Sequence, residues 1–138
     1  MSDARAAFGR RPMLSFTKLC VADLARSVDF YTRVLGMKQT AHYEFPDLHE
    51  VILKFTESLD EASLALMKWI PDREVVVGHE HGRLGIVTPD LDGLVERVRG
   101  AGFEVTEESR DLSEQGIRVV FVADPDGYAI EIVEMLQR

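Results

Sequence analysis

The stretch VADLARSVDFYTRVLGMK, residues 21–38, decides the fold. Its third residue, Asp23, is of a type that caps helix N-termini, and apolar residues spaced by four, three and four follow it. That spacing predicts an amphipathic helix that presents one apolar stripe to a core. Gly36 directly follows the stripe and predicts the end of the helix, because glycine adopts the left-handed backbone found there. The stripe consists of Leu24, Val28, Tyr31 and Leu35.

Strands are predicted on both sides of this helix. Before it, residues 14–21 (LSFTKLCV) alternate between two faces, which is typical of a β-strand. After it come three strand segments, separated by polar turns at residues 46–47 and 57–61: Met37–Tyr43, Glu50–Thr56 and Ser63–Lys68. The first half of the chain therefore reads β-α-β-β-β.

The same order recurs in the second half, where Asp90 and Gly102 bracket another helix at nearly the same spacing as Asp23 and Gly36. The expected strands are Arg83–Thr88, Phe103–Thr106, Ile117–Ala123 and Tyr128–Glu134. A repeat of this kind points to one fold built from two similar units. We predict an α+β fold in which two βαβββ repeats, residues 14–69 and 83–134, form a curved mixed sheet around a pocket. Together they make a single domain over residues 14–138, preceded by a mobile N-terminal arm over residues 1–13.

Composition narrows the classes of function. The 138 residues carry a formal net charge of −8, which repels phosphate backbones and argues against a nucleic-acid partner. No apolar run approaches the roughly 20 residues of a membrane span, so no membrane partner is expected. The single cysteine, Cys20, rules out an intramolecular disulfide, which fits a reducing compartment. We expect a cytoplasmic protein.

Two motifs carry a family resemblance. The helix stretch of residues 21–38 resembles the first helix of glyoxalase I, and FVADPDGYAIEIVE (residues 121–134) resembles its last hairpin. Both motifs are typical of the glyoxalase/bleomycin resistance/dioxygenase (vicinal oxygen chelate) superfamily, which contains lyases, isomerases, dioxygenases and drug-binding proteins. The resemblance covers nearly all of residues 14–134 and implies a small-molecule ligand and a homodimer.

The resemblance also implies a metal site, and this sequence departs from it. Glyoxalase I holds a divalent metal through four side chains, whose positions fall here at Phe16, Ala65, Arg83 and Glu131. Only Glu131 offers a suitable donor, because phenylalanine and alanine cannot coordinate a metal and a guanidinium is cationic. His81, with His79 close by, would reach the Arg83 position only if the alignment shifted. We therefore expect no cofactor, with a divalent metal as the disfavoured alternative.

Strand alternation predicts which side chains line the pocket. The expected lining is mainly apolar and aromatic, with a few charged groups, as is usual in ligand sites. Among the expected lining residues, Cys20 and Trp69 replace side chains that hold glutathione in the family. This replacement argues further against lactoylglutathione chemistry. The predicted substrate-pocket residues are Phe16, Lys18, Cys20, Ala65, Met67 and Trp69.

Catalytic roles are predicted for Arg83 and Glu131, whose positions converge in the family. Arg83 would polarise a carbonyl or hold a carboxylate, and Glu131 would act as general base. The alternative is that the two side chains merely neutralise each other within a sheet. The predicted function is lyase or isomerase chemistry, without a metal, on a small aromatic or carboxylate-bearing molecule. Two alternatives remain open: a non-catalytic drug- or metabolite-binding protein, and a metal-dependent lactoylglutathione lyase.

Overall fold

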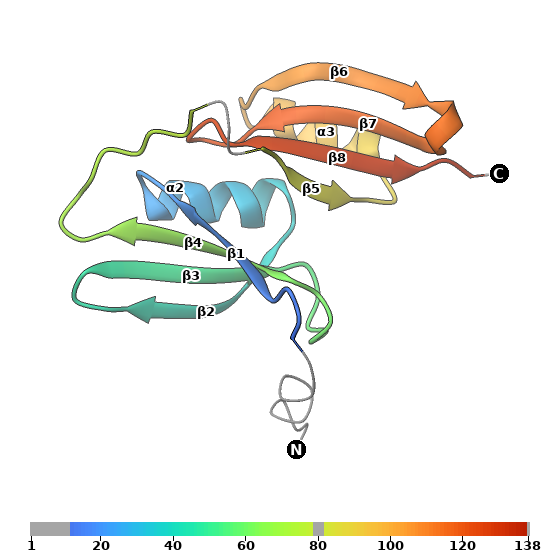
Figure 1. Ribbon diagram of the computed structural model, residues 1–138. Helices are drawn as coiled ribbons and strands as arrows, with labels where there is room; N and C mark the ends of the chain where they lie inside the picture. Colours follow the sequence, from blue (N-terminus) through green and yellow to red (C-terminus); the bar gives the residue numbers. More distant parts are fainter. Residues whose placement is uncertain (1–11, 79–81, 138) are drawn as a thin grey trace. The chain divides into compact units, whose positions relative to one another are not determined.

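The structure is a computed structural model, and it describes residues 12–78 and 82–137. The chain divides into two compact units. Unit 1 runs to Thr32 and resumes over Gly36–Arg73, whereas unit 2 takes Arg33–Leu35 and the chain from Glu74 onward. Each unit is one βαβββ repeat, which confirms the predicted fold (Figure 1). In the described part of the chain, no helix is long and apolar enough to cross a membrane.

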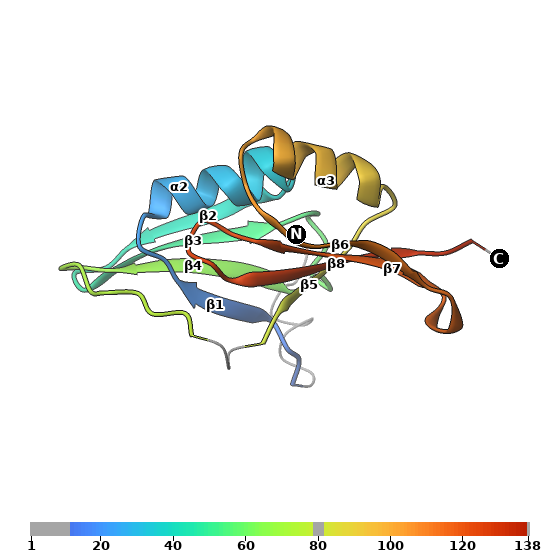
Figure 2. The same cartoon turned by 90° about the horizontal axis from the view of Figure 1, so that it is seen from above.

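Unit 1 is a four-stranded sheet in the order β1-β4-β3-β2. Strand β1 pairs with β4 in parallel, and the other neighbours are antiparallel. Helix α2 lies on one face of this sheet (Figures 1 and 2). The elements are β1 (Phe16–Cys20), α2 (Leu24–Asp29), the π-helical turn η1 (Phe30–Val34), β2 (Lys38–Glu44), β3 (Leu48–Lys54) and β4 (Ser63–Trp69).

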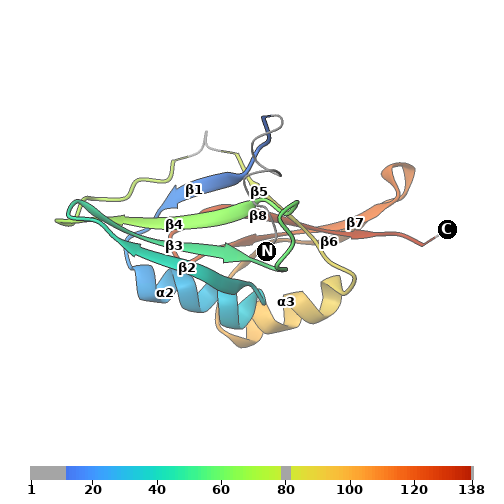
Figure 3. The same cartoon turned by 90° about the horizontal axis from the view of Figure 1, so that it is seen from below.

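Unit 2 repeats this plan in the order β5-β8-β7-β6, again with its first and last strands parallel. Helix α3 covers one face of its sheet, and Figure 3 shows the two layers from the opposite side. The elements are β5 (Leu84–Val87), α3 (Leu91–Gly100), β6 (Val105–Leu112), the 3-10 turn η2 (Ser113–Gln115), β7 (Ile117–Ala123) and β8 (Ala129–Met135).

Both helices begin and end where the sequence predicts. Asp23 Oδ1 accepts a hydrogen bond from Arg26 N at 3.0 Å, and Asp90 Oδ1 accepts one from Gly93 N at 3.0 Å. These are N-cap bonds that satisfy amides left free at a helix start. Gly36 follows the first helix with φ +93°, a left-handed conformation that residues with a Cβ rarely adopt.

Each core lies between the helix and the sheet of its unit. Fully buried side chains point from the sheet toward the helix at alternate positions, such as Leu53 and Leu66 in unit 1 and Ile130 and Ile132 in unit 2. The residues between them point to the opposite side, which we call the free face of each sheet. The predicted pocket residues lie on the free face of unit 1, and the predicted catalytic residues lie on that of unit 2.

The predicted strand Phe103–Thr106 is wrong in extent, because β6 covers Val105–Leu112 instead. Its middle is polar, so the strand shows no apolar alternation. It lies at the edge of its sheet and is held by backbone pairing with β7, with two register shifts. The predicted arm over residues 1–13 falls largely outside the described residues.

Candidate functional site

The free face of unit 1 brings the predicted pocket residues together. Strand register places Lys18 opposite Ala65 and Cys20 opposite Met67. Residues opposite each other in a sheet point to the same side, so these four share the free face. Trp69 follows Met67 by two positions on β4 and therefore lies on the same face. Phe16, at the start of β1, is 55% exposed on this face.

An ion pair crosses the middle of this face. Lys18 Nζ lies 2.7 Å from Glu50 Oε2, although Lys18 is on β1, Glu50 is on β3, and β4 runs between them. The lysine side chain therefore passes over β4, where Ala65 is its register partner. The Ala65 side chain is a single methyl group, so it leaves room on the free face for the lysine to cross. The lysine also lies 5.5 Å from the centre of the Phe16 ring.

Glu50 is a site residue that the sequence prediction missed. It lies opposite Met67 in the sheet, and only 11% of its side chain is exposed. A carboxylate this buried needs a partner, and Lys18 supplies it. The alternation of β3 is the signal that could have revealed Glu50, because it shares a face with Leu48 and Ile52.

Two stacked pairs lie at the end of the same free face, near the turn between β2 and β3. The rings of Tyr43 and Phe45 stack with centroids 6.1 Å apart and an interplanar angle of 28°. The guanidinium carbon of Arg73 lies 4.0 Å from the centre of the Trp69 ring. Of these four residues, the sequence prediction named only Trp69.

The free face of unit 2 holds the predicted catalytic residues. Glu131 lies opposite Gly85 on β5 and opposite Phe121 on β7. Arg83 precedes β5, and its guanidinium carbon lies 4.4 Å from the centre of the Phe121 ring. Since β8 runs between β5 and β7, the arginine crosses β8 much as Lys18 crosses β4. Arg83, Phe121 and Glu131 therefore gather on one face.

Arg83 and Glu131, both among the described residues, are not joined by an ion pair within 4.0 Å. The guanidinium lies against an aromatic ring instead, an arrangement that is favourable without a carboxylate. Glu131 is half-buried, and its β5 neighbour, Gly85, has no side chain to cover it.

The donor set does not fit a metal ion. At the four positions implied by the resemblance, Phe16 and Ala65 offer no donor atom and Arg83 offers a cation. Within residues 12–78 and 82–137, no three His, Cys, Asp or Glu side chains gather closely enough to hold a metal. The alternative candidates His79 and His81 lie outside the described residues. His42 lies 3.6 Å from Glu44 in an exposed pair.

Comparison with known proteins agrees with this architecture. The family model "Glyoxalase/Bleomycin resistance protein/Dioxygenase superfamily" matches residues 13–132. A lactoylglutathione lyase of Escherichia coli O157:H7 is 34% identical over 125 residues, covering 88% of this chain and 91% of its own length. One from Haemophilus influenzae is 35% identical over 122 residues, covering 86% and 89%.

Solved structures show the same fold. Glyoxalase I of Leishmania major superimposes with a TM-score of 0.79 at 27% identity, covering 90% of this chain and 87% of its own. The antibiotic-binding protein TnmS3 of Streptomyces sp. CB03234 reaches 0.72 at 20% identity, covering 91% and 98%, a likeness of fold alone. The chain thus belongs to the glyoxalase/bleomycin resistance protein/dioxygenase superfamily.

Proposed function

We propose that this protein is a lyase or isomerase that moves a proton on a small aromatic or carboxylate-bearing molecule without a divalent metal. The observation that carries the proposal is the arrangement of Arg83 over Phe121, beside Glu131 but not paired with it. A cation and a base that share a face without neutralising each other are each available to a ligand.

Each residue has a distinct role in this proposal. The Arg83 guanidinium donates hydrogen bonds to a substrate carbonyl oxygen and stabilises the negative charge that develops there. The Glu131 carboxylate accepts a proton from the carbon next to that carbonyl and can return it to a neighbouring atom. Phe121 positions Arg83 by lying beneath its guanidinium. Arg83 aligns with a position that holds a metal ligand in the family, and its guanidinium supplies positive charge in place of the metal ion.

The test is proton exchange on phenylpyruvate, which has an aromatic ring, a carboxylate and acidic hydrogens next to a ketone. Protein treated with a chelator to remove metal is incubated with phenylpyruvate in D₂O. NMR follows the loss of the signal from the hydrogens on the carbon between the ring and the ketone. We expect exchange faster than the buffer rate, and a fall of about 10²- to 10⁴-fold in the Glu131→Gln variant, the usual contribution of a general base.

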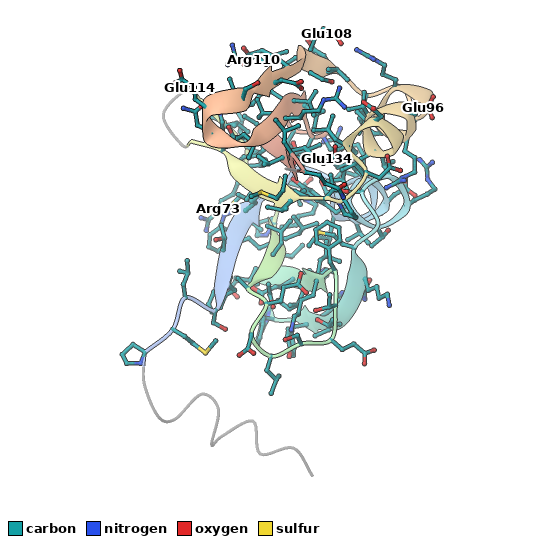
Figure 4. The ribbon with its side chains drawn as sticks, turned by 90° about the vertical axis from the view of Figure 1, so that its right-hand side faces the viewer. Arg73, Glu96, Glu108, Arg110, Glu114 and Glu134 are labelled. Carbon is teal, nitrogen blue, oxygen red and sulfur yellow. The ribbon has the colours of Figure 1, made fainter. Side chains whose placement is uncertain are left out.

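A matched control is Glu96→Gln, because Glu96 is an exposed carboxylate that points outward from α3 (Figure 4). It should exchange like the unsubstituted protein. Exchange that is unchanged in Glu131→Gln contradicts the proposal, as does activity that appears only when nickel, zinc or iron is restored. The second outcome would favour a metal-dependent lactoylglutathione lyase, the activity named for the 34%-identical relative.

A second candidate is a binding protein without catalysis. The stacked aromatic pairs on the free face of unit 1 favour it, because they offer contact surface but no base. Binding of phenylpyruvate with no acceleration of exchange by the unsubstituted protein supports this candidate and overturns the enzyme.

The family resemblance further suggests a homodimer in the cytoplasm. The single cysteine excludes an intramolecular disulfide, and this fits a reducing compartment. Light scattering on the eluting protein tests the assembly, and a monomer at micromolar concentration contradicts it.

A further inference from the structure

The free face of unit 1 ends in a strip of exposed and half-buried apolar side chains near the turn between β2 and β3. Tyr43 and Phe45 are 48% and 49% exposed, so both residues are open to a ligand. Phe45 N donates a hydrogen bond to Leu48 O at 2.9 Å. This bond closes the turn and places Phe45 beside Leu48. Leu48 in turn lies opposite Trp69 on β4. The residue after β2, the first residue of β3 and the last residue of β4 thus form one apolar row.

Arg73 adds a positive charge to one end of this row. Its guanidinium carbon lies 4.0 Å from the Trp69 ring centre, which fixes the position of the charge. The adjacent carboxylate, Asp72, is paired with Lys68 instead. Among the described residues, no carboxylate forms an ion pair with Arg73. The strip therefore combines exposed rings with a positioned cation that is not compensated.

We propose that this strip, formed by Tyr43, Phe45, Leu48, Trp69 and Arg73, binds a planar aromatic carboxylate. The aromatic ring packs on Leu48 between Phe45 and Trp69, and the carboxylate accepts hydrogen bonds from the guanidinium of Arg73. A guanidinium held over an aromatic ring still presents its N–H edge, which matches a carboxylate in two parallel hydrogen bonds.

The spacing of the strands suits one ring. Phe45 directly follows β2 and Trp69 ends β4, with β3 between these two strands, so their backbones are about 9.5 Å apart. A ring stacked against both needs centroid separations of about 4.5 Å on each side, or about 9 Å in all. The charge pattern also fits, since the nearby Lys18–Glu50 pair is neutral overall and leaves Arg73 as the cation that an anion would meet.

The ligand class named here is that of the small molecule proposed above, and to that extent the inference rests on the proposed function. The binding measurement is nevertheless independent of turnover. Trp69 is the only tryptophan in the sequence and is part of the strip, so its fluorescence reports binding at this place.

The experiment titrates the full-length protein with 2-naphthoate and, separately, with the uncharged 2-naphthamide. Binding is measured by calorimetry and by the change in Trp69 fluorescence. We expect the naphthoate to bind at least tenfold more tightly than the amide. In Arg73→Gln this preference should disappear, while the weaker binding of the amide persists. Phe45→Ala should weaken both ligands by a similar factor, because it removes one wall.

Arg110→Gln is the matched control, since Arg110 is an exposed arginine on β6 that points outward from unit 2 (Figure 4). It should bind both probes like the unsubstituted protein. Equal affinity for naphthoate in Arg73→Gln overturns the proposal, and so does the absence of naphthoate binding at millimolar concentration. If sedimentation then shows a dimer that Phe45→Ala converts to a monomer, a second copy of the chain occupies the strip instead.

The two proposals fail separately. Naphthoate binding that depends on Arg73, together with exchange that does not depend on Glu131, contradicts only the catalytic proposal. Glu131-dependent exchange without Arg73-dependent binding contradicts only the inference drawn from the strip.

Discussion

The ion pair between Lys18 and Glu50 should be asymmetric, because the two partners differ in their access to water. The side chain of Lys18 is 37% exposed, whereas that of Glu50 is 11% exposed. Removing Glu50 leaves a lysine that can turn toward water. Removing Lys18 leaves a largely buried carboxylate without its partner. We therefore expect Lys18→Met to destabilise the protein more than Glu50→Gln does.

The structure sets the size of this difference. Two unit charges 2.7 Å apart attract with about 6 kcal/mol at an effective dielectric of about 20, and with about 1.5 kcal/mol in water. The desolvation of Glu50 offsets part of this attraction. We expect Lys18→Met to lower the free energy of unfolding by about 2–3 kcal/mol, less than for a fully buried pair because Lys18 is partly solvated. Glu50→Gln should cost about 1 kcal/mol, since its amide oxygen still accepts from Lys18.

Urea unfolding followed by Trp69 fluorescence measures these values in unit 1, which contains both partners and the tryptophan. The decisive variant is the double substitution Lys18→Met with Glu50→Gln. It should be more stable than Lys18→Met alone, because the stranded charge is gone. Lys38→Met, at an exposed lysine of the same sheet, should change stability by less than about 0.5 kcal/mol. If the two single losses simply add in the double variant, the reasoning is refuted.

Two further predictions concern stability elsewhere. Burial raises the pKa of Glu61, but hydrogen bonds from Thr56 Oγ1 and the Phe55 and Thr56 amides, with the charge of Lys54, outweigh it and hold the pKa below its ordinary value. A depressed pKa stabilises the fold above the unfolded-state value of about 4.3 and loses that effect as the pH falls through the folded-state value. The melting temperature of Glu61→Gln should thus lie below that of the unsubstituted protein at pH 7 and approach it at pH 3, whereas Glu57→Gln in the same loop shows no such convergence. Asp90→Ala removes the cap bond to Gly93 and should cost about 1 kcal/mol in urea unfolding followed by circular dichroism; a loss no greater than that of the exposed Glu96→Ala would contradict the capping role.

The repeat was predictable because both of its helices carry complete local signals. Asp23 and Gly36 mark the first helix through contacts within a few residues, and so does Asp90 for the second. Strand β6 lacked such a signal, because backbone pairing with β7 defines it and its own side chains are mostly polar. Its predicted extent was accordingly wrong.

The candidate site was predictable only one strand at a time. Alternation placed Lys18 and Ala65 on the same face, which the strand register confirms. Identifying Glu50 as the partner of Lys18 requires knowing that β3 lies two strands from β1 and in which register. Arg73 lies after the last strand of unit 1, where no periodicity applies, so its contact with Trp69 had no local signal.

The path of Lys18 over Ala65 limits any attempt to rebuild a metal centre in this scaffold by protein engineering. Restoring donors at Phe16, Ala65 and Arg83 looks like three independent substitutions. A glutamate introduced at position 65, however, would occupy the space that the lysine crosses and would attract its ammonium group away from Glu50. The new carboxylate would then be bound by Lys18 before any ion reached it. A working redesign must therefore change Lys18 and Glu50 together with the ligands, five positions rather than three.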